Sequence, residues 1–225
     1  DNTVSAIIRM RENFQDQLGD TVEEWVEFFD EKRFLAHASI GENIIFGSPV
    51  SDSYTVSNLM KNTFFLKFLD DADLARPLIS LGKEIAFQTV DVLQNISHDK
   101  IFFEKTPVKI DEFDRYEVLT QDVKNKRLHQ FSSSQTHALM ELALRFSPAK
   151  HPIASIPEFM ENLVLEGRFL FRERIQNKDP NAVAFFRNDQ YIHSQTIFNN
   201  ILFGIPKSLS PGVQEKINQQ MVALL

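Results

Sequence analysis

The chain contains no cysteine among its 225 residues. Disulfide bonds are therefore excluded, and the absence is compatible with a reducing compartment. No apolar run approaches the roughly 18 residues of a membrane-spanning helix, and no secretory signal is recognisable. The formal net charge of −7 argues against nucleic acid or an anionic membrane as a partner, because both favour a basic face. We therefore expect a soluble chain with no nucleic-acid partner and no direct membrane insertion.

The sequence also lacks a P-loop, the ATP-binding loop that requires the pattern G-x-x-x-x-G-K-[ST]. Its only Gly-Lys pair, Gly82-Lys83, is followed by Glu84 and has Pro77 where the first glycine belongs. The segment 25–31 only superficially resembles an apolar strand ending in Asp-Glu, since a glutamate interrupts it. Without these parts, the chain cannot hydrolyse ATP unaided.

Other catalytic and metal-binding patterns are missing as well. The six histidines occur singly, without the spacing of a zinc site. Neighbouring carboxylates such as Asp70-Asp71 lack the alternating loop and the glycine of a calcium site. Ser132 to Ser134 lack the G-x-S-x-G elbow of a serine hydrolase. We therefore predict no catalytic residue, no metal ligand and no cofactor of the chain's own.

What the sequence does contain is an internal repeat. Residues 26–49 and 183–206 are identical at nine of 24 aligned positions, at one fixed offset of 157 residues. At the same offset the match continues weakly upstream, through Arg11/Arg168 and Phe14/Phe171. A period this long indicates two related lobes, not a solenoid. We define the repeat units as about 9–49 and 166–206, joined by a helical middle region of about 53–165.

Each repeat unit predicts a short capped helix. Ser39 and Thr196 are favoured N-cap residues, and Glu42 completes a capping box in the first unit. Gly47 and Gly204 suit the left-handed position that ends a helix, and a proline follows each glycine two residues later. The expected unit is a strand, a loop and a helix of about two turns.

The whole chain is predicted to be mainly α with a few short β-strands. The strands are expected near 26–29, 101–103 and 183–186, and the main helices near 57–69, 78–92, 137–146, 157–175 and from Pro211 onward. Around 101–119 the pattern is ambiguous, because a helix beginning near Arg115 explains it nearly as well. The sequence begins with Asp1 and stops within an amphipathic pattern, so we expect 1–225 to be a single fragment of a larger protein.

The repeat resembles one region of the nucleotide-binding domains of ABC transporters, especially exporters. The resemblance rests on a short strand, a polar loop, an apolar pair and the run [ST]-I-x-x-N-I-[IL]-F-G, and it covers about a fifth of the chain. In that family the segment follows the glutamine loop. Asn188 in the second unit and Glu31 in the first fall on the glutamine position.

The resemblance implies a role in coupling. In the family, the loop glutamine reaches the nucleotide's metal and water, while the loop transmits motion to the membrane domain. Asn188 and Glu31 are thereby the candidate nucleotide-contacting positions. The residues expected to shape the helix corner of each unit, as structural or interface residues, are Ser39, Asn43, Phe46, Gly47, Thr196, Asn200, Phe203 and Gly204. ATP and magnesium would be bound by the parent protein, whose nucleotide-binding and transmembrane domains would be the partners. A homodimer in the parent is implied, on the cytoplasmic side of a membrane.

A second interpretation stays open. The chain would then be a non-enzymatic helical domain for protein interaction or regulation, with a repeat that arose by internal duplication and F-G units that serve as structural corners. The flanking coding sequence distinguishes the two interpretations, because only a transporter would supply a P-loop upstream and an L-S-G-G-Q motif downstream.

Overall fold

The computed structural model describes residues 2–96 and 100–223. In these ranges the helices are α1 (Asn2–Val22), α2 (Ile40–Ile45), α3 (Thr63–Asp71), α4 (Ala75–Leu93), α5 (Lys100–Phe103), α6 (Phe113–Val123), α7 (Ser133–Arg145), α8 (Glu158–Lys178), α9 (Ile197–Leu202) and α10 (Pro211–Ala223). The strands are β1 (Val26–Phe28), β2 (Gly47–Pro49), β3 (Val183–Phe185) and β4 (Gly204–Pro206). The predicted class, mainly α with a few short strands, is confirmed.

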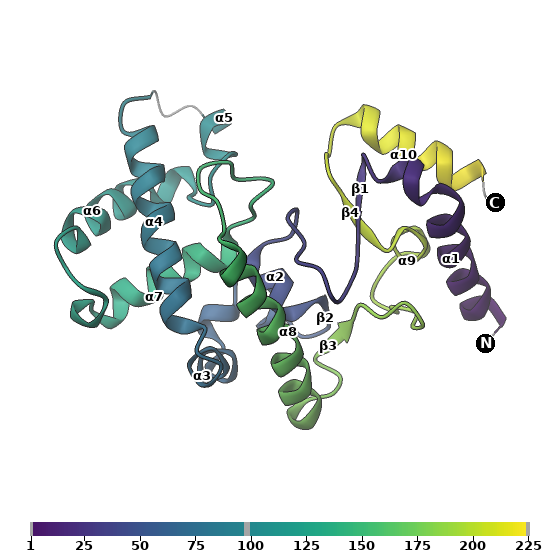
Figure 1. Cartoon of the computed structure of the whole chain (residues 1–225), viewed down its shortest axis with the longest axis horizontal. Coiled ribbons are helices and arrows are strands. Elements are labelled where there is room, and N and C mark those ends of the chain that lie inside the picture. Colours follow the sequence, from purple (N-terminus) through teal and green to yellow (C-terminus); the bar gives the residue numbers. More distant parts are fainter. Residues whose placement is uncertain (1, 97–99, 224–225) are drawn as a thin grey trace.

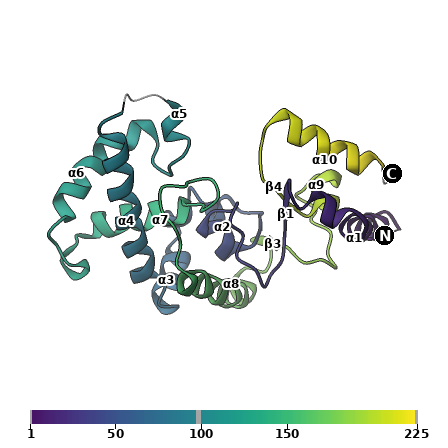
Figure 2. The same cartoon turned by 45° about the horizontal axis from the view of Figure 1, so that its top comes forward.

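The elements form two lobes (Figure 1). The large lobe holds α2 to α8, in which α4 packs against α7 and α2 packs against α8. In the small lobe, α1 packs against α9 and α10, and the turned view of Figure 2 keeps these three helices together. The buried core of the small lobe consists of Ile7, Phe14, Val22, Val26, Ile201, Leu202, Ile217 and Met221. In the described part of the chain, the buried residues of this core therefore lie before 29 or after 196.

The four strands form two antiparallel ribbons, and each ribbon takes one strand from each repeat unit. β1 pairs with β4, so that Val26 lies opposite Pro206. β2 pairs with β3, so that Pro49 lies opposite Val183. The two pairings are equivalent within the repeat, because Val26 corresponds to Val183 and Pro49 corresponds to Pro206. The repeat units thus complete each other's sheets.

The chain crosses between the lobes twice. The first unit has α1 in the small lobe and α2 in the large lobe, and the second unit has α8 in the large lobe and α9 in the small lobe. The loops 29–39 and 186–196 make these crossings. Each lobe therefore pairs the long helix of one unit with the short capped helix of the other.

The predicted N-caps are confirmed. The Ser39 hydroxyl accepts from the Glu42 amide at 3.1 Å, and the Glu42 carboxylate accepts from the Ser39 amide at 2.7 Å, which forms the expected capping box. The Thr196 hydroxyl accepts from the Asn199 amide at 3.1 Å and caps α9. Both helices therefore begin where the sequence predicts.

The predicted left-handed positions were wrong by one residue. Phe46 and Phe203 adopt φ values of 42° and 45°, whereas no described glycine has a positive φ. Gly47 and Gly204 instead begin strands, where space is limiting. A Cβ on Gly47 would lie 2.6 Å from Val183 Cγ1, and one on Gly204 would lie 2.7 Å from the Glu27 carbonyl oxygen. These glycines are required for close approach of the strands and not for backbone conformation.

Two further expectations need correction. Residues 101–103 belong to helix α5 and not to a strand, because a helical turn buries Phe103 against Phe113 while Phe102 stays exposed. The alternative helix near Arg115 is borne out by α6. The expected helix over 57–69 is divided into a 3₁₀ turn (Leu59–Lys61) and α3, which the Asn62 side chain caps through the Phe65 amide.

Candidate functional site

The two repeat units meet in a region that we call the joint, which consists of the loops 29–39 and 186–196 and the short helices α2 and α9 that follow them. Two buried arginines hold the joint together. Arg168 on α8 is 2% exposed and reaches into the loop of the first unit. Its Nε donates to the Asn43 carbonyl at 2.8 Å, and its Nη2 donates to Asn43 Oδ1 at 2.9 Å. Its Nη1 donates to the carbonyls of Asp30, Glu31 and Arg33 at 3.2, 2.7 and 3.0 Å. One guanidinium thereby fixes the loop and the capped helix together.

Arg11 on α1 does the same in the second unit, with 1% of its surface exposed. Its Nε donates to the Asn200 carbonyl at 2.7 Å, and its Nη2 donates to Asn200 Oδ1 at 3.3 Å. Its Nη1 donates to the carbonyls of Arg187, Asn188 and Gln190 at 3.1, 2.7 and 3.0 Å. Every acceptor lies 157 residues after its counterpart around Arg168. The repeat is therefore preserved atom by atom, although each arginine serves the opposite unit.

Asn43 and Asn200 organise the loops that the arginines hold. The Asn43 side chain accepts from the Leu35 amide at 2.8 Å and donates to the Leu35 carbonyl at 2.9 Å, and Asn200 makes the same two bonds to Ile192 at 2.8 and 2.9 Å. Each amide also donates to the carbonyl of its N-cap residue at 3.0 Å. Both asparagines are fully buried. An amide is required here, because it supplies an acceptor and two donors at once.

The phenylalanines with positive φ place their rings against the guanidinium groups. Arg168 Cζ lies 4.0 Å from the centroid of the Phe46 ring, and Arg11 Cζ lies 4.1 Å from the centroid of the Phe203 ring. Such cation–π contacts are strong when the partners are desolvated. The strained backbone and the buried cation therefore belong to one feature, which the F-G sequence encodes.

Burial lowers the pKa of both arginines but leaves them protonated. Desolvation lowers the pKa of Arg168 to about 10, against the opposing effect of the Asp30 and Glu31 carboxylates. Desolvation also lowers the pKa of Arg11. Since an arginine is effectively always protonated in proteins, both guanidinium groups stay cationic and bind mainly neutral carbonyls at the joint.

An open groove of about 930 Å³ runs along the joint, and Glu31 and Asn188 both line it. The Glu31 carboxylate accepts from Arg172 Nη1 at 3.1 Å. The backbone carbonyl of Glu31 is held by Arg168, and that of Asn188 is held by Arg11. The structure therefore brings the two predicted positions into one groove, as equivalent anchor points of the two loops.

The groove also contains a stacked pair of rings. Phe29 and Phe186 are equivalent residues of the two units and directly follow β1 and β3. Phe46 and Phe203 each contact this pair edge to face, at centroid distances of 5.3 to 6.2 Å. The two crossing loops thus start at a shared aromatic contact.

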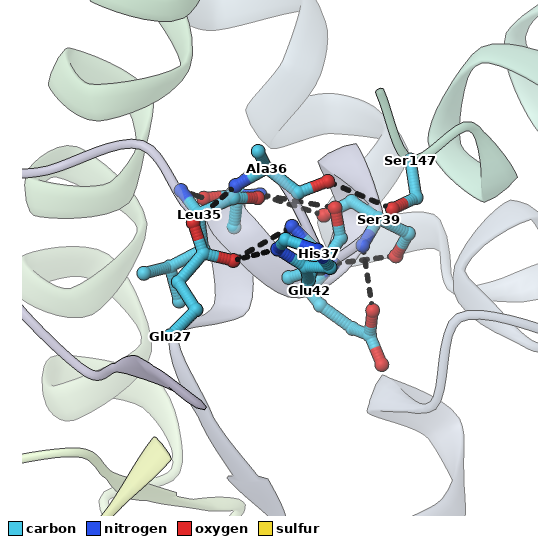
Figure 3. A network of polar contacts seen from close by, with 9 residues as sticks. Glu27, Leu35, Ala36, His37, Ser39, Glu42 and Ser147 are labelled. Atoms are coloured by element: carbon cyan, nitrogen blue, oxygen red, sulfur yellow. Dashed lines mark hydrogen bonds and ion pairs between the residues drawn. The ribbon is translucent and has the colours of Figure 1, made fainter. Parts of the chain in front are cut away.

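In the first unit, a carboxylate on β1 secures the crossing loop, as Figure 3 shows. The Glu27 carboxylate accepts from the amides of Ala36 and His37 at 2.9 and 2.7 Å, and it lies 3.0 Å from His37 Nδ1. The Ala36 carbonyl in turn accepts from the Ser147 hydroxyl at 2.9 Å. The first loop is therefore tied to a strand and to the large lobe.

The second unit has Ala184 at the position equivalent to Glu27, so no carboxylate binds its loop there. Ser48 binds the second loop instead. The Ser48 hydroxyl on β2 lies 2.9 Å from the Ser194 hydroxyl and accepts from Gln195 Nε2 at 3.0 Å. The carboxylate that accepts from two backbone amides in the first unit is thus replaced by hydrogen bonds between neutral side chains in the second. The joint is symmetric in its arginines and asymmetric in these contacts, because only the first loop is also bound by a carboxylate.

Comparisons with known proteins find no match: no protein-family model, no curated protein and no solved structure matches the chain. Over residues 2–96 and 100–223, no three or more His, Cys, Asp or Glu side chains gather as a metal site. No helix in the part of the chain that the structure describes is long and apolar enough to span a bilayer.

Sequence reasoning missed the residues that do most at this joint. Arg11 and Arg168 were visible only as part of the weak upstream match of the repeat. The available signal was the recurrence of an arginine at the 157-residue offset of the repeat. Glu27 had no comparable signal, since it has no counterpart in the second unit.

Proposed function

We propose that the chain is a non-catalytic coupling segment of an ABC-transporter ATP-binding protein. In this proposal it relays the movement that ATP binding and hydrolysis produce elsewhere in the parent. The parent would bind ATP and magnesium on the cytoplasmic side of the membrane, and its nucleotide-binding and transmembrane domains would be the partners. The transporter assignment rests on the resemblance of residues 183–204 to the segment after the glutamine loop. The relay within it rests on the reciprocal clamp, in which Arg11 and Arg168 each bind the loop of the opposite unit.

The clamp supports a relay for a mechanical reason. A shift of the first loop moves the carbonyls that bind Arg168 and therefore pulls on α8, which leads directly to β3 and the second loop. The Phe29 and Phe186 rings connect the same two loops from the other side. Packed elements with few alternative arrangements move together, so the loops should respond as one unit.

Hydrogen–deuterium exchange of the Arg168→Lys variant tests this relay. A lysine keeps the charge but loses the planar fork that binds several carbonyls. We expect faster exchange over 30–43 and also over 187–200, where Arg11 remains intact. Arg172→Lys is the matched control, since Arg172 makes a more exposed ion pair on the same helix and should leave both loops unchanged. An effect confined to 30–43 would contradict the relay.

The transporter assignment has its own test. The coding sequence on either side should supply G-x-x-x-x-G-K-[ST] upstream and L-S-G-G-Q with an apolar strand ending in Asp-Glu downstream. The chain alone should show no magnesium-dependent ATP binding in equilibrium dialysis, and tight binding or turnover would refute a purely coupling role.

The second candidate is a helical interaction or regulatory domain with an internal duplication. It is favoured by the satisfaction of both arginines and both asparagines within the chain, so that the joint needs no outside group. Flanking sequence without a P-loop, combined with a localised exchange response, would select this function.

A further inference from the structure

The small lobe is assembled from two separate stretches of the chain. The first stretch, residues 2–28, is named the N-arm and holds α1 and β1. The second stretch, residues 197–223, is named the C-arm and holds α9, β4 and α10. The small core lies between these arms, which also pair through β1 and β4. Each arm therefore offers the other an apolar face and a strand edge.

Each arm is connected to the large lobe by a single loop, and the loops are 29–39 and 186–196. The contacts between the arms do not depend on which molecule supplies them, because the same N-arm and C-arm exist in every copy. Exchange of identical elements between copies is a low-cost route to a dimer, since it reuses contacts that already exist.

We propose that a second copy of this chain binds by exchanging arms, so that the N-arm of each copy packs against the C-arm of its partner. Arg11 would then seat on the 187–190 loop and Asn200 of the partner copy. Arg168 would stay on the first loop of its own copy, since α2 and α8 both belong to the large lobe. The joint is already a two-fold arrangement within one chain, and the exchanged dimer repeats it between two.

Concentration decides between the two forms. Within one molecule, the loops 29–39 and 186–196 tether both arms to the same large lobe, which gives them an effective concentration on the order of millimolar. The closed monomer is therefore favoured in dilute solution, and exchange is favoured when the chain refolds at a concentration approaching that value. The exchanged dimer should persist after dilution, because its arms separate only when the small core opens.

A pair of cysteines across the β1–β4 ribbon tests the exchange, since the chain has no other cysteine. Val26 and Pro206 lie opposite each other, and directly opposed residues in an antiparallel pair are within disulfide range. The variant Val26→Cys with Pro206→Cys is refolded from denaturant at about 10 µM and at about 1 mM, near the effective concentration of the arms. Monomer and dimer are separated by size exclusion, oxidised and run on a non-reducing gel.

The matched control is Val183→Cys with Pro49→Cys, which places the same residue types on the β2–β3 ribbon. In an exchanged dimer the first variant should give covalently linked dimers, whereas the control should give disulfides within each copy. If the first variant folds poorly, Glu27→Cys with Ile205→Cys and its control Ala184→Cys with Ser48→Cys repeat the test one position along each ribbon.

Failure to form a dimer at millimolar concentration would overturn the proposal. A dimer in which the Val26→Cys and Pro206→Cys pair closes within each copy would overturn it as well, since the copies would then associate through another surface. Neither outcome bears on the coupling function, which concerns the joint within one molecule.

Discussion

Phe29 and Phe186 stack face to face, with ring centroids 3.8 Å apart and ring planes 6° apart. Each ring lies where its unit leaves a strand and begins to cross between the lobes. The contact joins equivalent residues of the repeat, so it marks the point where the two units meet. The joint is thus a symmetric contact at its centre, clamped on each side by an arginine from the opposite unit.

Replacing either stacked ring should have the same effect. Phe29→Leu and Phe186→Leu each lose the shared stack, worth about 1 kcal/mol beyond buried area, together with the edge-to-face contacts to Phe46 and Phe203. We expect a loss in unfolding free energy of about 1–3 kcal/mol. Denaturant unfolding followed by circular dichroism measures it. The double variant should lose less than the sum, because the same contact cannot be lost twice. Strictly additive losses would show that the stack is not a shared contact.

Removing an arginine of the clamp should be far more damaging. Arg168→Ala removes the donor from the buried carbonyl and Oδ1 of Asn43 and from the part-buried carbonyls of the first loop. A buried group left unsatisfied costs about 1–3 kcal/mol, so we expect a loss of roughly 3 kcal/mol or more. Arg172→Ala on the same helix should cost less than about 1 kcal/mol, because its ion pair with Glu31 is only partly buried. Equal midpoints of thermal unfolding for the two variants would reject the clamp.

The strand-initiating glycines should tolerate no side chain. Gly47→Ala and Gly204→Ala place a Cβ within 3 Å of the facing strand, and overpacking of this kind typically costs about 1–3 kcal/mol. The larger Gly47→Val and Gly204→Val changes should cost at least as much. Gly19→Ala in α1 is the control, since nothing lies within 4 Å of its Cβ, and it should stabilise the helix by up to about 1 kcal/mol.

His151 should make stability depend on pH. Burial lowers its pKa from 6.5 to about 4, and its Nδ1 accepts from the Ser147 amide at 3.0 Å. The unfolded chain therefore binds a proton more readily, so this contribution is complete above pH 6.5 and is lost as the pH falls toward 4. After allowance for partial solvent screening, we expect a loss of about 1–2 kcal/mol across this window.

The variant His151→Gln provides the control for that pH dependence. Glutamine keeps an acceptor for the Ser147 amide but does not titrate. The unfolding free energy of the variant should therefore change less between pH 7 and pH 4.5 than that of the unmodified chain. Unfolding in urea at the two pH values measures both. An identical pH dependence would show that other groups are responsible.

The repeat and its caps were predictable because they depend on local sequence. Ser39 and Glu42 specify a helix start through bonds that span three residues, and the short strands follow from Val-x-Phe-Phe. The left-handed residue was misplaced because a glycine after a helix usually takes that conformation, whereas here the cation–π contact holds Phe46 in it. Tertiary packing overrode a local preference.

The exchange between the units could not be predicted from local sequence. Arg168 could equally have served the loop of its own unit, because the acceptors around Asn43 and Asn200 are the same. Sequence identity at an offset shows that two units are alike but not how they pair. Nothing in the local sequence marks the two arginines as buried, although the structure leaves at most 2% of either exposed.

A double-mutant cycle on the two clamps tests the central claim most directly. Arg11→Lys, Arg168→Lys and the double variant are unfolded in urea, and the three losses in unfolding free energy are compared. If the units form one joint, the double variant should lose less than the sum of the single variants by about 1 kcal/mol or more. Losses that add to within about 0.5 kcal/mol would contradict the account, because they would show that the two clamps act independently.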